Sequence, residues 1–318
     1  MNDSAPSSSL PTAFARLRDA IGGVVIGQDN PVRFVFLTLL CSGHSLLEGV
    51  PGVAKTLLVR TLAAAVGIRF GRIQFTPDLL PSDIIGTTVF QPGSGEVQFR
   101  PGPVFTDLLL ADEINRASSK TQAALLEAMQ ERTVTVDGHP HALGPHFGVF
   151  ATQNPVEQEG TYPLPEAELD RFLFKIVVDY PAEADELALL AAHHDDSRQA
   201  GSVDTVLSAA DLDAARQVVK QVTVRDEILS YVAALVRATR ADVNFALGVS
   251  PRGGLMLLRA AKANAAVEGR DYVLPEDVQE VFLATLRHRV QIDPGAEVEG
   301  LRPDQALQRT MASVTVPR

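Results

Sequence analysis

The sequence predicts an α/β domain with a mostly parallel sheet flanked by helices, followed by an all-helical domain. Short apolar runs alternate with helix-like segments, which is the pattern of parallel strands joined by crossover helices. The runs cover residues 45–47, 70–75, 108–111, 147–152 and 172–178. Beyond Tyr180 the strand-like runs stop and helices dominate. We therefore expect an α/β domain over residues 13–181, and a helical domain with a C-terminal tail over residues 182–318.

Composition narrows the class of protein. A chain of 318 residues that is 46% hydrophobic can bury a core large enough for two domains. Its net charge of −11 disfavours a broad nucleic-acid surface. The single cysteine, Cys41, lies in an apolar run, so we expect a buried thiol and no internal disulfide.

The N-terminal residues 1–12 are rich in Ser and Pro and lack the basic region and apolar core of a signal peptide. We expect them to be a disordered leader. No run approaches the roughly 18 apolar residues that a membrane helix requires. The expectation is a cytoplasmic protein without membrane insertion.

Two segments interrupt the alternation of the first domain. Residues 86–103 read as a glycine-turned excursion, and residues 133–139 carry the alternation and Asp-Gly turn of a hairpin. In the second domain we expect helices over 211–220, 225–239, 252–267 and 276–289. Ser250-Pro251 and Pro275-Glu-Asp supply start signals for the last two.

A phosphate-binding loop is the most informative motif. The segment Gly49-Val-Pro-Gly-Val-Ala-Lys-Thr56 lies between the run 45–47 and an amphipathic helix, in the strand–turn–helix order of a P-loop. N–H groups at the helix start would hold phosphate oxygens, while Lys55 reaches the outer phosphates and Thr56 ligates magnesium. The expected nucleotide contacts in this loop are Gly49, Pro51, Gly52, Val53, Ala54, Lys55, Thr56 and Leu57.

One position departs from the common P-loop pattern. Ala54 stands where the second glycine is expected, and a positive φ there would strain alanine by about 1 kcal/mol or more. The alternative interpretation is a Gly/Pro-rich turn that caps an ordinary helix.

An acidic pair argues against that alternative. Asp112 and Glu113 end the apolar run 108–111, downstream of the loop. In this arrangement the first carboxylate, Asp112, holds magnesium and the second, Glu113, polarises an attacking water. A strand followed by an acidic helix cap would look similar in isolation.

Four segments together resemble the MoxR family of AAA+ ATPases. They are the loop ending at Lys55-Thr56, Ala-Asp-Glu-Ile-Asn-Arg-Ala over 111–117, Ala-Thr-Gln-Asn-Pro over 151–155 and Glu-Leu-Asp-Arg-Phe over 168–172. The similarity extends over nearly the whole chain after the leader. It implies an AAA+ core, a helical lid, and Mg-ATP bound between core and lid. The family also tolerates alanine before the P-loop lysine.

The resemblance assigns further site residues. Asn154 would orient the attacking water, Arg171 would be the arginine finger that contacts the neighbouring subunit's nucleotide, and Arg252 would be the sensor arginine of the lid. Val25 and Ile26 would cradle adenine. Arg116 fits either a second cross-subunit contact or a surface arginine. His139, His141 and His146 fit no standard metal spacing.

The implied function is chaperone-like. Such a protein would hydrolyse ATP in a homo-oligomeric ring, expected to be a hexamer, and remodel a client that carries a von Willebrand factor A domain. The two projecting segments would contact the client. Alternatives are a magnesium-chelatase-like motor subunit and a non-hydrolysing ATP switch. A nucleic-acid motor is disfavoured because Asp137-Gly-His-Pro-His141 puts no lysine or arginine at the hairpin tip.

Overall fold

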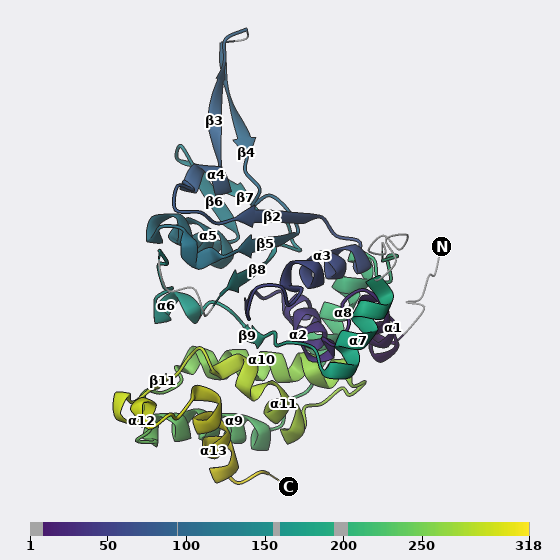
Figure 1. The fold of residues 1–318 in the computed structure, drawn as a ribbon, viewed down its shortest axis with the longest axis vertical. Helices are drawn as coiled ribbons and strands as arrows, with labels where there is room; N and C mark the ends of the chain where they lie inside the picture. The colour runs from purple at the N-terminus through teal and green to yellow at the C-terminus, as the bar shows by residue number, and fades with distance from the viewer. Residues whose placement is uncertain (1–8, 94, 155–159, 194–202, 318) are drawn as a thin grey trace.

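A five-stranded parallel sheet forms the centre of the first domain (Figure 1). The computed structural model describes residues 9–93, 95–154, 160–193 and 203–317. The strands follow the order β2–β5–β8–β1–β9, and all four neighbouring pairs are parallel. Their bounds are β1 Ser45–Glu48, β2 Phe70–Gln74, β5 Leu108–Asp112, β8 Gly148–Gln153 and β9 Phe174–Val177. The five strands predicted from the apolar runs are confirmed to within two residues.

Alternate residues of these strands enter two separate cores. Leu108 and Leu110 of β5 pack on one face of the sheet, whereas Leu109 and Ala111 pack on the other. Both faces are covered, so a central strand such as β5 is buried along its whole length. This explains why the central strands appear in the sequence as continuous apolar runs.

Helices cover both faces of the sheet. On one side lie α1 (Leu10–Gly22), α2 (Asp29–Leu40) and α3 (Lys55–Ala65), where the rings of Phe14 and Phe36 stack at 5.4 Å. On the other side lie α4 (Pro81–Ile85), the 3₁₀ turn Ile114–Arg116 and α5 (Ser119–Glu131).

The expected leader is too long by three residues. Leu10, Pro11 and Thr12 belong to α1, because Pro11 occupies the first helical turn, where its missing N–H leaves no hydrogen bond unmade. Residues 1–8 of that leader lie outside the described part of the chain.

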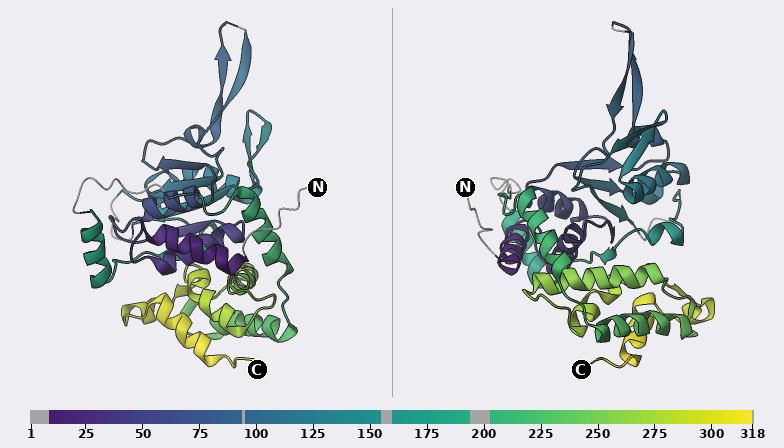
Figure 2. Two further views of the ribbon diagram at one scale, coloured as in Figure 1. Left: turned by 90° about the vertical axis from the view of Figure 1, so that its right-hand side faces the viewer. Right: turned by 180° about the vertical axis from the view of Figure 1, so that it is seen from behind.

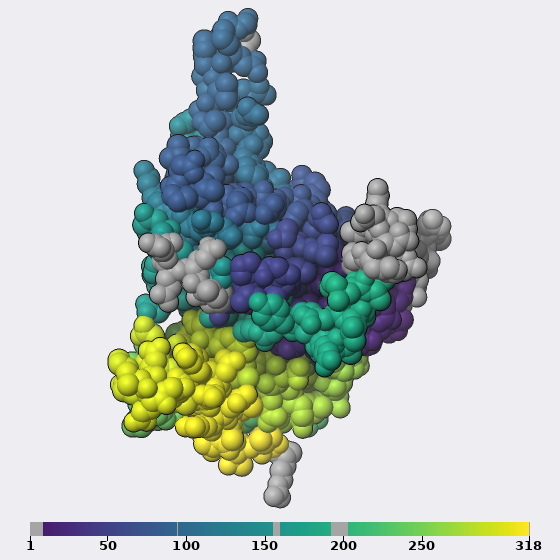
Figure 3. All heavy atoms as spheres, in the orientation of Figure 1, coloured from purple at the N-terminus to yellow at the C-terminus, as the bar shows by residue number. Residues whose placement is uncertain are grey.

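The two segments that interrupt the alternation are antiparallel hairpins that stand side by side. They are β3 (Gly86–Gln91) with β4 (Glu96–Pro101), and β6 (Thr133–Val136) with β7 (His139–Ala142). The hydroxyl of Thr88 donates to the carboxylate of Asp137, and the rings of Phe99 and His141 stack at 3.8 Å. The longer hairpin projects clear of the body (Figure 3).

The second domain adds a lid of helices below the sheet (Figure 2). Its elements are α9 Asp226–Ala241, α10 Pro251–Val267, α11 Pro275–Leu286, α12 Pro294–Val298 and α13 Pro303–Ser313, with a short ladder of β10 (Phe245–Leu247) and β11 (Gln291–Ile292). Helix α10 packs on α1 and α2, and α11 packs on β9. The lid therefore lies along the β9 side of the core.

Two described helices follow β9 and lead to the lid. They are α7 (Glu183–His193) and α8 (Ala209–Gln221), whereas the short helix α6 (Glu166–Leu169) lies within the core, between β8 and β9. Helix α8 packs on α2 and α10. Helix α7 lies beside the 25–28 segment, so close that a Cβ at Gly27 would lie 2.9 Å from the side chain of Asp185. Among the helices described, none combines the length and the apolar character needed to cross a membrane.

Candidate active site

The P-loop connects the carboxyl end of β1 to the first turn of α3. At its start the backbone touches the residue that follows β9, since a Cβ on Gly49 would lie 2.2 Å from the carbonyl oxygen of Val178. At its end Ala54 has φ 62° and ψ 23°, which is the left-handed conformation that glycine adopts without strain. Alanine tolerates this conformation at a cost of about 1 kcal/mol. The structure thus bears out the positive φ considered for this position.

Lys55 lies among carboxylates at this edge of the sheet. Its ammonium donates to two carbonyl oxygens of the P-loop, that of Val50 at 3.1 Å. Partial burial lowers the pKa of Lys55, while the charges of Asp112, Glu113 and Glu48 act to raise it. The cation is thus oriented by the loop, close to the acidic pair.

Asp112 and Thr56 carry oxygen atoms that could serve as ligands of a divalent cation. The Thr56 hydroxyl lies 3.5 Å from Asp112 Oδ2, and the Thr152 hydroxyl donates to Asp112 Oδ1 at 2.6 Å. Magnesium prefers oxygen ligands, keeps several waters and needs only one or two carboxylates. The hydroxyl and carboxylate oxygens therefore fit magnesium, either directly or through its water shell.

Glu113 has a constrained backbone and a held side chain. Its φ of 55° is left-handed, and its N–H donates to the Thr152 hydroxyl at 2.8 Å. Gln74 and Arg116 donate to its carboxylate at 2.8 and 3.0 Å. Strained backbone of this kind concentrates at functional sites. Arg116, for which the sequence left two roles open, pairs with Glu113 of its own chain.

Arg72 and Gln74 are site residues that sequence reasoning missed. Arg72 donates to Asp112 Oδ2 at 2.7 Å and to Gln74 at 2.8 Å, which links the two carboxylates through one chain of side chains. Both residues lie on β2, whose register sets Gln74 beside Asp112. The only signal in the sequence was polar alternation at the end of that run, and its meaning depends on β2 being the neighbour of β5.

Asn154 and the 25–28 segment lie around the same edge. Asn154 is buried and follows β8, the strand between β1 and β5. Gln28 donates to the carbonyl oxygen of Asp179 at 2.9 Å, just beyond β9. Val25 is buried and Ile26 is half-buried. The structure therefore brings the expected adenine segment and the P-loop to the same end of β9.

Arg171 lies at the opposite side of the sheet from the P-loop, where the amino ends of the strands are. It precedes β9, and two residues later Leu173 N–H donates to the carbonyl oxygen of His44, which precedes β1. A strand of four residues separates these two edges by about 13 Å. Arg171 therefore does not meet Lys55 of its own chain.

Arg252 lies with Arg171 rather than with the P-loop. The two line a cavity of about 200 Å³ together with Arg132 and Arg259. Arg252 also approaches Asp170 at 3.8 Å. In its own chain Arg252 therefore lies near the amino end of β9 and away from the P-loop, because α10 begins there.

Comparisons with known proteins show the family to which the chain belongs. The model of the ATPase family associated with various cellular activities (AAA) matches residues 44–174, and that of the AAA lid domain matches residues 237–310. The chain is 45% identical to chaperone MoxR1 of Mycobacterium tuberculosis, covering 93% of this chain and 80% of that protein. The chain belongs to the MoxR family of AAA+ ATPases.

Two further similarities cover nearly the full length of this MoxR-family chain. The uncharacterized protein YeaC of Bacillus subtilis is 46% identical over 93% of this chain and 92% of its own. A crystal structure of a proposed ATPase from Cytophaga hutchinsonii superimposes with a TM-score of 0.89 at 40% identity, covering 97% of this chain and 96% of that one. The fold and the lid are thus those of the family.

Arg289 contacts the segment that carries Arg171, and the MoxR-family motifs did not reveal it. From the lid it donates to Asp170 Oδ1 at 2.8 Å and to the carbonyl oxygens of Phe172 and Leu173 at 2.6 and 3.3 Å. Burial lowers its pKa to about 10, although the carboxylate of Asp170 opposes the shift. One buried guanidinium therefore holds the segment that carries Arg171.

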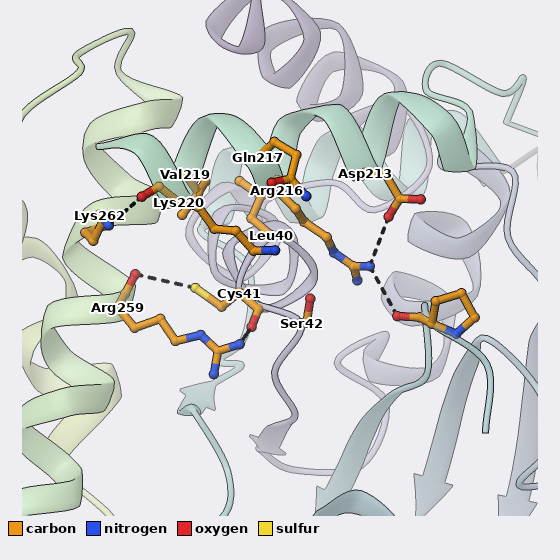
Figure 4. Close-up of a pocket in the computed structure, with 11 residues that line it drawn as sticks. Leu40, Cys41, Ser42, Asp213, Arg216, Gln217, Val219, Lys220, Arg259 and Lys262 are labelled. Carbon is orange, nitrogen blue, oxygen red and sulfur yellow. Dashed lines mark hydrogen bonds and ion pairs between the residues drawn. The ribbon is translucent and has the colours of Figure 1, made fainter. Parts of the chain in front are cut away.

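A larger cavity of about 310 Å³ lies between α2, α8 and α10 (Figure 4). Its arginines are bonded within the fold: Arg216 donates to the carbonyl oxygen of Leu39 at 3.0 Å, and Arg259 donates to that of Cys41. Burial raises the pKa of the Cys41 thiol to about 12, so it stays protonated. These contacts join core and lid, and we assign the cavity no catalytic role.

Proposed function

We propose that this chain hydrolyses Mg-ATP at the subunit interfaces of a hexameric ring. One observation carries the proposal: the P-loop and Arg171 lie at opposite edges of the same sheet. A nucleotide at the P-loop is beyond the reach of Arg171 in its own chain, so the site is completed by Arg171 and Arg252 of a neighbouring copy. Head-to-tail contacts of this kind close into rings.

Each residue at the carboxyl edge has a defined task in this proposal. Lys55 binds the outer phosphates, Thr56 and Asp112 hold magnesium, Glu113 polarises the attacking water and Asn154 orients it. Bound magnesium would neutralise charge on the phosphates. The arginines of the neighbour would stabilise the charge that develops on the transferred phosphoryl group.

A mixing experiment tests the shared site. Glu113→Gln and Arg171→Ala should each abolish ATP hydrolysis when assayed alone. In an equal mixture, interfaces that pair an intact Glu113 with an intact Arg171 form again, and random assembly should restore about one quarter of the wild-type rate. A mixture that remains inactive while rings form would refute catalysis in trans.

We further propose that the hydrolysis cycle remodels a client protein in the cytoplasm, and that the β3–β4 hairpin contacts it. The resemblance suggests a client with a von Willebrand factor A domain. Support comes from three apolar side chains on the hairpin, Val89, Phe90 and Val97, which are 42%, 61% and 66% exposed. Apolar groups exposed together at a projecting tip are typical of contact surfaces.

Phe90→Ser tests the client contact. It should abolish the stimulation of ATP hydrolysis by a purified von Willebrand factor A domain protein and leave the unstimulated rate unchanged. Val298→Ser is a matched control, because Val298 is 90% exposed in the lid. Equal stimulation of both variants would exclude the hairpin as the contact.

A further inference from the structure

Helix α7 carries an exposed stripe of two acids followed by two leucines. Glu183, Glu186, Leu187 and Leu190 have the i, i+3, i+4, i+7 spacing of one helix face. Leu187 and Leu190 are 63% and 65% exposed. Asp185, on a different face, turns toward Gly27. We call these four residues the α7 stripe.

A groove of complementary character lies between α9 and α10 of the lid. It encloses about 290 Å³, and its wall is mostly apolar. Leu229 and Leu255 are 44% and 70% exposed. Because Gly254 has no side chain, α10 packs close to α9: a Cβ at Gly254 would lie 3.3 Å from the side chain of Val236. The residues of this α9–α10 groove are Leu229, Val232, Ala233, Val236, Arg237, Arg240, Pro251, Gly254, Leu255 and Leu258.

The charges at one end of the groove match those of the stripe. Arg237 and Arg240 lie toward the carboxyl end of α9 and are exposed. Arg240 Nε donates to the carbonyl oxygen of Val249 at 2.7 Å. Within the described residues, however, neither arginine forms a salt bridge, and neither do Glu183 and Glu186. An amphipathic helix that lays an apolar face into such a groove is a common mode of recognition.

The two surfaces lie on the two sides that the proposed ring brings together. The α7 stripe is next to the 25–28 segment and so to the P-loop side. The groove includes Pro251, the neighbour of Arg252. It lies on a face of α10 adjacent to the face that lines the cavity of about 200 Å³ around Arg171 and Arg252. In Figures 1 and 2, α7 stands at the side of the core and not against α9 of its own lid.

We propose that the α7 stripe of one copy docks into the α9–α10 groove of the next copy. The leucines fill the apolar part, and the glutamates face Arg237 and Arg240. The stripe is short enough to fit, since Glu183 to Leu190 spans about 11 Å along α7 and Leu229 to Arg240 spans about 17 Å along α9. The inference rests on the proposed function only in that it requires a ring.

Two variants separate the two halves of this contact. The stripe variant is Leu187→Glu with Leu190→Glu, and the groove variant is Leu255→Glu. Val298→Glu is the matched control, since Val298 is 90% exposed outside the groove. Thermal unfolding checks that each variant remains folded, as expected for exposed positions.

Sedimentation velocity with Mg-ATP measures assembly. Each variant should require at least about tenfold more protein than the control to assemble. An equal mixture of the two variants is the decisive sample. The intact groove of the stripe variant can bind the intact stripe of the groove variant, but the altered surfaces at the two ends of this pair bind no further copy. The mixture should therefore form a dimer and no ring. As a second measurement, Glu186→Arg should weaken assembly, and adding Arg237→Glu should restore it.

The possible outcomes distinguish this contact from the ring itself. Rings that persist in both variants would overturn the contact and leave the ring proposal standing. A groove variant that assembles normally but no longer responds to a client would make the groove a client site instead. A wild-type chain that stays monomeric at every concentration would overturn the ring, and the contact with it.

Discussion

Replacing Arg289 tests whether the lid holds in place the segment that carries Arg171, the proposed arginine finger. The guanidinium is buried and connects the lid to the carboxylate of Asp170 and to the backbone of residues 170–173. Removing Arg289 takes away the buried donor of these carbonyl oxygens and the nearer of two cations from Asp170, which is partly exposed and keeps Arg252 at 3.8 Å, so the cost should be about 3 kcal/mol, the lower end of the range for a buried ion pair. Arg289→Gln should therefore lower the free energy of unfolding by about that amount.

Activity should respond in a way that general destabilisation does not explain. Arg171 would lose its support, so kcat should fall, while KM for ATP should hold because the P-loop lies at the other edge of the sheet. Arg289→Lys keeps the positive charge but not the planar set of N–H donors. Its kcat and its free energy of unfolding should therefore lie between those of the wild type and those of Arg289→Gln.

Urea denaturation and steady-state ATP hydrolysis measure these two effects. Arg18→Gln is the control, since its pair with Asp19 is largely exposed and should contribute less than about 1 kcal/mol. If Arg289→Gln matched this control in both assays, the reasoning would be refuted.

Three further predictions concern pH and the P-loop. Burial lowers the pKa of His44 to about 3 and holds that of His288 well below its ordinary value. Between the pKa of about 6.5 in the unfolded chain and the much lower pKa in the folded chain, about 3 for His44, only the unfolded chain gains these protons, so the free energy of unfolding should fall by up to about 1.4 kcal/mol per pH unit for each histidine as the pH is lowered. Urea titrations should show a smaller slope for His44→Gln, and an equal slope would contradict this. Gly49→Ala places a Cβ 2.2 Å from a carbonyl oxygen and should weaken nucleotide binding at least about tenfold in a fluorescence titration, whereas unchanged binding would mean the loop adapts. Ala54→Gly removes the strain of alanine in a left-handed backbone conformation, so the free energy of unfolding should rise by up to about 1 kcal/mol. A clear fall in the free energy of unfolding would count against strain at that position.

Much of the fold was predictable because local patterns encode it. The five strands were found from apolar runs, since a strand buried on both faces has no polar positions to interrupt it. Asp137 and Gly138 have positive φ, as the Asp-Gly signal of a hairpin requires. The short ladder of β10 and β11, with three and two residues, is too brief to leave such a pattern.

The candidate site was only partly predictable. The loop residues and the acidic pair have motifs that extend over a few neighbouring positions. Arg72 contacts Asp112 across 40 residues of sequence, and Arg289 contacts Asp170 across 119. No local pattern encodes such pairs, because each depends on which strands or domains lie together.

By itself, the sequence determined the P-loop, the acidic strand end and the order of strands and helices along the chain. Backbone torsion preferences and side-chain periodicity act over one turn or one strand, so these features are visible without a structure. Only the tertiary structure decided that Arg171 and Arg252 lie together at the edge opposite Lys55. That placement follows from strand direction and from the packing of α10 and α11 against the β9 side of the core, which are long-range properties of the folded chain.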